Sequence, residues 1–115
     1  MQRKTQLLFG VHNHQPIDNF DWVVDNAISK CYEPFFHTMD RFPSIKLSVH
    51  FSGWLLEYIY KKNRDLFDLL KKLSDEGRIE FFGGGYFEPI LSSIPSDDRV
   101  GQIKLLNKFL KKHFG

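Results

Sequence analysis

Two histidines follow the first apolar run of the chain and are the first residues with the chemistry of a functional site. Residues 7–11 are apolar and lead directly to His12 and His14, and Pro16 ends the stretch. Side chains at positions i and i+2 of a strand share a face, so both imidazoles should point the same way where the strand ends. In α/β folds the carboxyl ends of parallel strands carry the active site. We therefore expect the site to be centred on this strand end.

The histidine pair is compatible with three kinds of chemistry. The rings can bind a metal ion, since neutral imidazoles on one face resemble the first ligands of barrel metallohydrolases; His50 and Glu88 are then the available further ligands. The rings can instead donate to substrate hydroxyl groups, together with the Gln15 amide. The third alternative is a proline-terminated turn in which backbone groups satisfy both rings.

Two further strand ends supply polar groups. Residues 45–52 alternate between apolar and polar side chains, which predicts a second strand with His50 near its end. Residues 78–82 predict a third strand, in which Glu80 lies between two apolar residues. Because a buried carboxylate needs a partner, we expect Glu80 to face the barrel interior and to pair with His50 or His12; the alternative is that it faces solvent on a less buried strand.

The third strand leads into a glycine-rich loop that carries two aromatic residues and a carboxylate. The three glycines at 83–85 lack the Lys-Ser/Thr of a phosphate-binding loop, and we expect them to allow a ligand to approach the backbone closely. Tyr86 and Phe87 would supply flat faces for sugar rings, and Glu88 would accept hydrogen bonds from hydroxyl groups. The simpler alternative is a tight turn that buries an aromatic ring.

The spacing of apolar residues places these strand ends on a β-α-β-α-β-α chain of the α/β class. Strands are predicted at residues 6–11, 45–52 and 78–82, and helices at 20–32, 34–42, 53–60, 66–73 and 96–114, with a break or kink near Pro34. Helical crossovers imply parallel strands. Three such units cannot close a barrel, which needs about eight strands. We therefore expect residues 1–115 to form a partial catalytic barrel domain, truncated before the fourth strand.

Composition narrows the class of protein. The 115 residues include 42% hydrophobic and 26% charged side chains, as in an ordinary folded domain. A net charge of +2 gives no electrostatic basis for binding nucleic acid or a membrane, and we expect neither as a partner. The single Cys31 excludes an internal disulfide, and no run is long enough for a signal peptide or a membrane span. These features predict a cytoplasmic protein.

Two segments together resemble a known family. Residues 9–16, Phe-Gly-Val-His-Asn-His-Gln-Pro, are similar to the first sequence region of glycoside hydrolase family 57, and residues 83–91, Gly-Gly-Gly-Tyr-Phe-Glu-Pro-Ile-Leu, are similar to its second. Residues 49–53 and 94–99 also resemble the 4-α-glucanotransferase and α-amylase members. The likeness runs over nearly the whole chain, and the two regions in this order are specific to the family.

The resemblance implies a (β/α)7 barrel that acts on α-1,4-glucans with retention of anomeric configuration. Retaining enzymes use a nucleophile and an acid/base, which the family takes from later strands, so no catalytic residue is assigned here and the chain alone should be inactive. No cofactor or metal is implied; the expected partners are an α-glucan or maltooligosaccharide and the rest of the barrel. The residues expected to bind sugar are His12, His14, Gln15, Glu80, Gly85, Tyr86 and Glu88, with His50 and Trp54 as further candidates.

Two other functions stay open. A metal-dependent barrel hydrolase, such as a deacetylase, would use His12, His14 and His50 as metal ligands. A non-catalytic glucan-binding module would bind sugar through its aromatic rim alone. Within the leading hypothesis the sequence does not separate hydrolysis from transfer, because that choice depends on whether water or a sugar hydroxyl reaches the glycosyl-enzyme.

Overall fold

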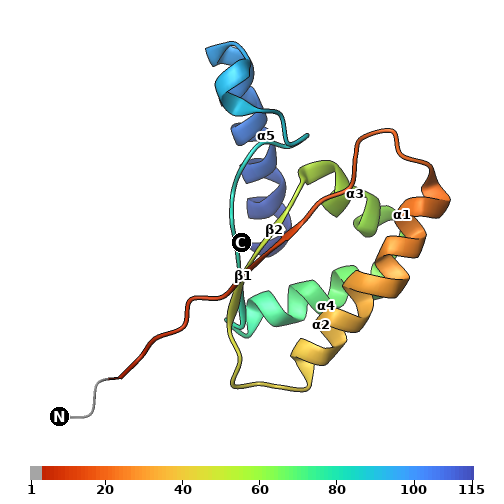
Figure 1. The fold of residues 1–115 in the computed structure, drawn as a ribbon, viewed down its shortest axis with the longest axis vertical. Helices are drawn as coiled ribbons and strands as arrows, with labels where there is room; N and C mark the ends of the chain where they lie inside the picture. The colour runs from red at the N-terminus through yellow and green to blue at the C-terminus, as the bar shows by residue number, and fades with distance from the viewer. Residues whose placement is uncertain (1–3) are drawn as a thin grey trace.

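A computed structural model describes residues 4–115 and shows a small sheet flanked by helices (Figure 1). The strands are β1 (Gly10–Asn13), β2 (Leu47–Phe51) and β3 (Ile79–Phe81). The helical segments are α1 (Asp21–Ala27), the π-helical turn η1 (Ile28–Tyr32), α2 (Glu33–Asp40), α3 (Gly53–Lys62), α4 (Arg64–Asp75), the 3₁₀ turn η2 (Leu91–Ser93) and α5 (Ser96–Phe114). The predicted alternation of strands and helices is confirmed.

The three strands form one open parallel sheet in the order β1-β2-β3. The parallel arrangement confirms the prediction from the helical crossovers between successive strands. His12 of β1 lies beside His50 of β2, and Ser48 of β2 lies beside Glu80 of β3. The register therefore brings histidines from two strands together.

One face of the sheet carries the hydrophobic core. Leu47, Val49 and Phe51 of β2 are buried with residues of the helices, including Phe36 of α2 and Leu70 of α4. Burying a side chain of this kind contributes about 1.5–3 kcal/mol. Figure 1 shows α1, α2, α3 and α4 gathered on one side of the strands. Since side chains alternate along a strand, those next to the core residues of β2 point to the opposite face.

The first strand begins later than its apolar sequence predicts. Residues 6–11 were expected to form it, but β1 spans Gly10–Asn13. The carbonyl of Phe9 accepts the first hydrogen bond from β2, through Ser48 N at 2.9 Å, while Leu7 and Leu8 are 85% and 95% exposed. The strand begins where the backbone of β2 is close enough to form hydrogen bonds with it. His12 therefore lies inside β1, and His14 directly follows it.

The helical stretch from Asp21 to Asp40 is continuous, so of the break or kink predicted near Pro34 the break is wrong. Instead, the π-helical turn η1 (Ile28–Tyr32) directly precedes Glu33 and Pro34. Proline lacks an N–H and its ring clashes with the carbonyl four residues earlier in an α-helix. A wider π turn at this point relieves that clash without ending the helix.

The boundaries around α4 follow ordinary capping chemistry. Asn63 separates α3 from α4, and its side-chain oxygen accepts a hydrogen bond from Leu66 N at 3.0 Å. After α4, Gly77 has φ +66°, the left-handed conformation that glycine adopts without strain at a helix end. These turns direct the chain from α3 through α4 into β3.

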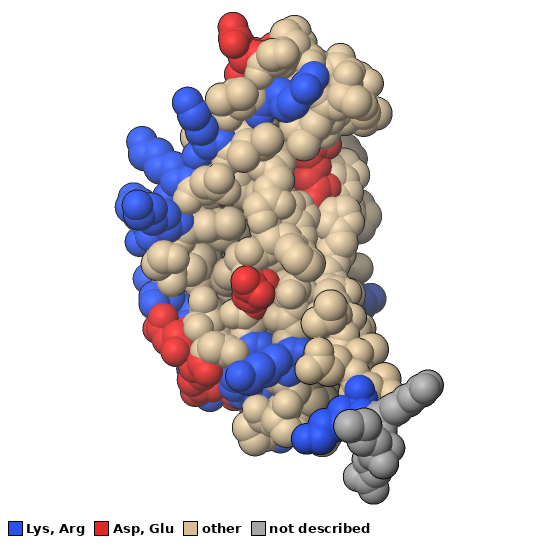
Figure 2. Space-filling model, turned by 90° about the vertical axis from the view of Figure 1, so that its left-hand side faces the viewer, with Lys and Arg blue, Asp and Glu red and all other residues tan. Residues whose placement is uncertain are grey.

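The side of the molecule opposite α1–α4 is largely uncharged. Figure 2 shows this side, on which most of the surface is formed by residues other than Lys, Arg, Asp and Glu, and basic side chains gather along one edge. Over residues 4–115, no helix combines the length and the apolar character that crossing a bilayer requires.

Candidate functional site

Three histidines converge on one carboxylate at the carboxyl ends of β1 and β2. His12 Nε2 and His50 Nε2 each lie 2.6 Å from Glu88 Oε1. His14 Nδ1 contacts the other carboxylate oxygen, Oε2. The prediction that groups far apart in sequence meet at one rim is confirmed for these four residues, which we call the histidine–glutamate cluster.

The glycine-rich loop brings Glu88 to the histidines. A Cβ on Gly84 would lie 2.9 Å from His50 Cε1, and a Cβ on Gly85 would lie 2.5 Å from Pro89 Cδ. Glu88 itself has φ +51°, a conformation that non-glycine residues rarely adopt. Its N–H donates to the Gly85 carbonyl at 3.2 Å and closes the turn. The glycines therefore let the loop fold tightly against His50 of β2 and against Pro89, while the close approach of a ligand to them stays a prediction.

Backbone contacts fix the orientation of His50. Its Nδ1 lies 3.3 Å from the Phe82 carbonyl, which can only accept a hydrogen bond, so Nδ1 carries the proton of that contact. Nε2 is thereby aimed at Glu88. The side chain of Asn13, buried between β1 and β2, donates to the His50 carbonyl at 3.0 Å. Asn13 was not predicted as a site residue; a polar residue at a buried strand position was the only sequence signal for it.

Opposing effects act on the pKa of Glu88. Burial raises the pKa of this carboxyl, and its side chain is only 14% exposed. The hydrogen bonds with His12 and His50, and the charges of His12 and His14, lower the pKa by more, so the net pKa lies below the ordinary value. Glu88 is therefore held as a carboxylate, ready to accept hydrogen bonds.

Gln15 supports the strand end instead of pointing a free amide at the cluster. Its Nε2 donates to the Tyr32 hydroxyl at 3.0 Å, and that hydroxyl donates to the His14 carbonyl at 3.2 Å. The turn after β1 is thus tied to the π-helical turn η1. In this arrangement Gln15 positions His14, while direct contact between the Gln15 amide and a sugar stays a prediction.

Tyr86 does not offer the flat face that the sequence suggested. Its ring is 6% exposed and packs directly against Gly53, the first residue of α3. Its hydroxyl donates to Glu57, and burial together with this bond raises the pKa of the hydroxyl. The expectation of a Tyr86 sugar platform is therefore wrong, because helix packing takes up the ring; the simpler alternative of a turn with a buried aromatic describes it.

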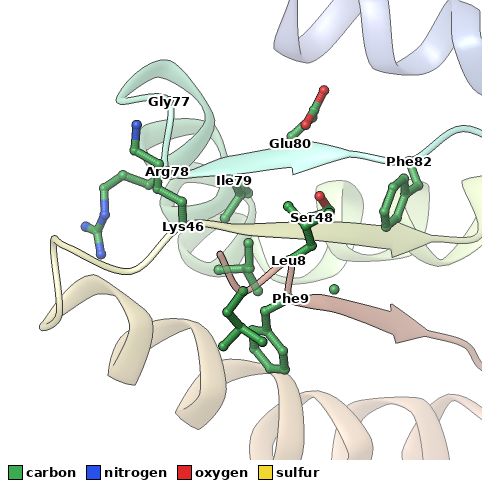
Figure 3. Close-up of a pocket in the computed structure, with 12 residues that line it drawn as sticks. Leu8, Phe9, Lys46, Ser48, Gly77, Arg78, Ile79, Glu80 and Phe82 are labelled. Carbon is green, nitrogen blue, oxygen red and sulfur yellow. The ribbon is translucent and has the colours of Figure 1, made fainter. Parts of the chain in front are cut away.

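Glu80 is exposed, as in the solvent-facing alternative, and lies apart from the cluster. It forms no hydrogen bond or ion pair with His50 or His12 within residues 4–115, so the predicted pairing is wrong. The reason is register: Glu80 lies beside Ser48, two residues before His50. In Figure 3 its carboxylate extends past β3, away from β2. Glu80 is exposed and needs no partner there.

The pocket drawn in Figure 3 is not the site indicated by the chemistry. It has a volume of about 330 Å³ and contains Glu80 but none of the four cluster residues. Its lining comes mainly from the residues before and at the start of the three strands. A second hollow, of about 480 Å³, is lined by His12 and His50 with Gly10, Phe82 and Gly83. This hollow adjoins the cluster at the strand ends.

Trp54 lines a separate aromatic hollow of about 570 Å³. Tyr58, Phe87 and Phe20 line it as well. Trp54 packs edge-on against Tyr58, with ring centroids 6.4 Å apart, and its Nε1 is buried without a partner among the described residues. Phe87 is exposed, unlike its neighbour Tyr86. A role for Trp54 in sugar binding stays a prediction.

The cluster combines two chemical abilities. Its imidazoles and carboxylate can donate to and accept from the hydroxyl groups of a bound sugar. The donor atoms of His12, His50 and Glu88 also lie within 4.8 Å of one another, a spacing at which they can share a metal ion. The geometry within the chain is compatible with both.

The comparisons agree on one group of proteins. The model of Glycosyl hydrolase family 57 matches residues 8–115. An alpha-amylase of Pyrococcus furiosus is 41% identical over 111 residues, which cover 96% of this chain and 17% of the relative. A 4-alpha-glucanotransferase of Thermococcus litoralis is 42% identical over 109 residues, which cover 95% of this chain and 16% of the relative.

A solved structure shows the same fold. The crystal structure of the Thermococcus litoralis 4-alpha-glucanotransferase superposes with a TM-score of 0.88 at 44% identity, over 91% of this chain and 16% of that one. The open parallel sheet and its helices thus match the amino-terminal part of that enzyme's barrel. The chain spans about a sixth of the length of the relatives it matches. Through its sequence and its fold, the chain belongs to glycosyl hydrolase family 57.

Proposed function

We propose that the chain is part of the catalytic barrel of an enzyme acting on α-1,4-glucans, an α-amylase or a 4-α-glucanotransferase, and that it positions the sugar. Family membership and the names of the relatives support this function over a metal-dependent hydrolase or a non-catalytic binding module. The nucleophile and the acid/base belong, in this proposal, to parts of the barrel outside this chain. The single Cys31 supports the cytoplasm as its location.

The convergence of His12, His14 and His50 on Glu88 is the observation that carries the proposal. A sugar hydroxyl placed at the cluster would donate to the Glu88 carboxylate and accept from an imidazole N–H. Such bonds fix the ring beside the bond to be cleaved. Those that strengthen as the sugar distorts towards its transition state increase kcat and not only affinity.

A chimaera tests the role of the cluster in catalysis. The matching segment of the Thermococcus litoralis 4-alpha-glucanotransferase is replaced by this chain, and transfer between maltooligosaccharides is measured. We expect an active chimaera. In it, Glu88→Gln and His14→Ala should each lower kcat/KM at least about tenfold, which corresponds to about 1.4 kcal/mol of transition-state stabilisation.

The control is His37→Ala, which removes a histidine of α2 that takes no part in the cluster. A folded chimaera without transfer activity, or one in which Glu88→Gln is as active as the parent, contradicts the proposal. Turnover of maltooligosaccharides by the isolated 115-residue chain would contradict the assignment of the catalytic carboxylates to other parts of the barrel.

A further inference from the structure

Tyr32 is a buried polar residue to which the proposed function gives no role. It ends the π-helical turn η1, it is 6% exposed, and its ring packs edge-on against Phe51 of β2, with ring centroids 6.0 Å apart. A buried hydroxyl needs hydrogen-bond partners. Tyr32 finds two of them in the segment that follows β1, and its hydroxyl thereby connects the helices to the end of the first strand.

The two hydrogen bonds of the Tyr32 hydroxyl involve His14 and the residue after it. The hydroxyl accepts from Gln15 Nε2 at 3.0 Å and donates to the His14 carbonyl at 3.2 Å. Burial raises the pKa of this hydroxyl by more than the bond from Gln15 lowers it, so the proton for the donated bond is retained. Both bonds hold the stretch of backbone from which the His14 imidazole reaches Glu88 Oε2.

The π-helical turn η1 directs Tyr32 towards the strand end. The buried residues of this helical stretch follow one another at intervals of four: Val24, Ile28, Tyr32 and Phe36. In an α-helix four residues make about 40° more than one full turn, so three such steps would rotate the row by about 120°. In η1 the Glu33 N–H instead donates to the Ile28 carbonyl, five residues earlier. This wider turn takes up more residues and keeps Tyr32 on the buried face.

His14 needs such support more than His50 does. The side chain of His14 is 42% exposed and that of His50 is 13% exposed, so burial fixes the orientation of His50 but not that of His14. A functional side chain has to be held within about 0.5 Å of its productive position by the groups around it. Single π turns within α-helices are also frequent at functional sites.

We propose that Tyr32 is a positioning residue of the sugar site. Through its bonds to Gln15 and to the His14 carbonyl, it holds the His14 imidazole in contact with Glu88. Its contribution to catalysis rests on the proposed function, whereas the positioning of the ring does not and is measured separately.

Nuclear magnetic resonance of the 115-residue chain tests the positioning. Tyr32→Phe removes the hydroxyl and retains the ring that packs on Phe51. The His12 and His14 rings are stacked, with centroids 6.0 Å apart, so their ring protons should show nuclear Overhauser contacts in the parent. These contacts should be lost in Tyr32→Phe. Tyr60→Phe makes the same change in α3, at a residue that takes no part in the cluster, and should retain them.

The chimaera with the Thermococcus litoralis 4-alpha-glucanotransferase tests the contribution to catalysis. Tyr32→Phe should lower kcat between about twofold and tenfold, the range expected for the loss of one hydrogen bond, with a smaller change in KM. A residue that only packs would not change kcat in this way, because phenylalanine retains the ring. Gln15→Leu breaks one of the same bonds without changing the buried ring, and gives the same two readouts if Tyr32→Phe does not fold.

The outcomes separate the positioning role from the proposed function. If folded Tyr32→Phe retains the contacts between the His12 and His14 rings, or if Tyr60→Phe loses them as well, the positioning role is overturned. If Tyr32→Phe loses these contacts but retains the kcat of a chimaera that Glu88→Gln impairs, its contribution to catalysis is overturned. A chimaera in which Glu88→Gln is as active as the parent contradicts the proposed function, while loss of the ring contacts in Tyr32→Phe would still support the positioning role.

Discussion

At the scale of single residues, Glu88 holds the site together more than any one histidine does. Its two oxygens contact the rings of His12, His14 and His50, which come from two strands and a turn. Glu88 reaches them in a left-handed conformation, with φ +51°. A non-glycine residue in this conformation carries strain of about 1–3 kcal/mol, which persists when the surrounding contacts compensate it. The contacts of Glu88 with the three imidazoles are suited to compensate this strain.

The lowered pKa of Glu88 predicts how the cluster responds to acid. Because the pKa of this carboxyl is lower in the folded state than its ordinary value of 4.5, the folded state binds the Glu88 proton less readily than the unfolded state does. Its stabilising contribution is therefore fully present above the ordinary value and is lost as the pH falls through the lower folded value. Carboxyl-detected NMR titration should give Glu88 a pKa below 4.5.

The matched variant for this titration is Glu88→Gln. It cannot ionise, so it should remove the part of the acid-dependent loss of unfolding free energy that Glu88 causes. Urea unfolding across the acid range measures this difference. If the unfolding free energy of Glu88→Gln depended on pH as that of the parent does, ionisation of Glu88 would not contribute to the stability of the fold.

Gly53 predicts a packing defect at the start of α3. A Cβ at this position would overlap the ring of Tyr86, and the Gly53 N–H donates to the Tyr86 carbonyl at 2.7 Å. Gly53→Ala must therefore displace Tyr86 or the helix start, and overpacking of this kind destabilises by about 1–3 kcal/mol. Urea unfolding of the purified variant measures the loss.

Gly101→Ala is the control for Gly53→Ala. Gly101 lies within α5, and a Cβ there would meet nothing within 4 Å. Alanine favours the helix over glycine by about 1 kcal/mol, so this substitution should stabilise the chain. Equal effects of the two substitutions, in sign and size, would contradict the proposed packing of Tyr86 on Gly53.

Residue types predicted which groups have the right chemistry, but not what each side chain contacts. His12, His14 and Glu88 could be grouped from strand periodicity, since parallel strands end at the same rim. Whether the Tyr86 ring is buried or exposed depended on its packing against Gly53 at the start of α3. The sequence around Tyr86 does not predict that contact. The contacts of Glu80 depended on the register of β3 against β2, which places Glu80 beside Ser48 and two residues away from His50. Both are tertiary facts.

At the scale of elements, Arg78 connects β3 to the end of α2. It is the residue before β3 and is buried. Its guanidinium donates to the carbonyls of Met39, Asp40 and Phe42 and to the Asp40 carboxylate. A helix leaves its last carbonyls without partners, and a cation at that end also complements the helix dipole. Arg78 thus caps α2 and sets the start of the third strand.

This cap predicts that Arg78→Met destabilises the fold while retaining most of the apolar stem. The carbonyls at the end of α2 would lose the donors that Arg78 supplies and would remain half-buried. Leaving such acceptors unsatisfied lowers the free energy of unfolding by roughly 1–3 kcal/mol. Lys72→Met is the control, because Lys72 pairs with the same Asp40 carboxylate from an exposed position, where an ion pair contributes less than about 1 kcal/mol. Thermal unfolding compares the two. A larger loss for Lys72→Met would contradict the capping role.

The order of the helices and strands was predictable from the sequence. The start of β1 and the π-helical turn η1 were not. The alternation of apolar and polar residues identified β2 and β3, because one face of each strand is more buried than the other. The start of β1 depended on where β2 offers partners, and Leu7 and Leu8 look like strand residues in isolation. The π turn before Pro34 is invisible to periodicity, since it replaces a break that proline normally predicts.

At the scale of the whole molecule, the open sheet leaves apolar side chains uncovered. Leu7, Leu8 and Phe9 precede β1, and Phe82 follows β3; all four are exposed. Figure 2 shows a broad uncharged surface on the side of the molecule opposite α1–α4. The relatives are about six times as long as this chain, and in our proposal the rest of the barrel covers this surface in the complete enzyme.

The uncovered surface predicts that the isolated chain associates with itself. Exposed apolar patches and unpaired strand edges promote contact between copies. The average mass measured by sedimentation should therefore rise with protein concentration. It should also rise with added sulfate, which strengthens apolar association, whereas association through charges would weaken as salt screens them.

Substitutions locate the associating surface. Leu8→Lys and Phe82→Ser should each lower the tendency to associate, because they place polar groups at the two ends of the sheet face. Trp22→Ser removes an equally exposed aromatic from α1, on the helical side of the molecule, and should have little effect. If Trp22→Ser alone restored the monomer, the helical side would be the contact surface. The open sheet would then have to be protected by its own side chains, with Phe82 folded over Gly10.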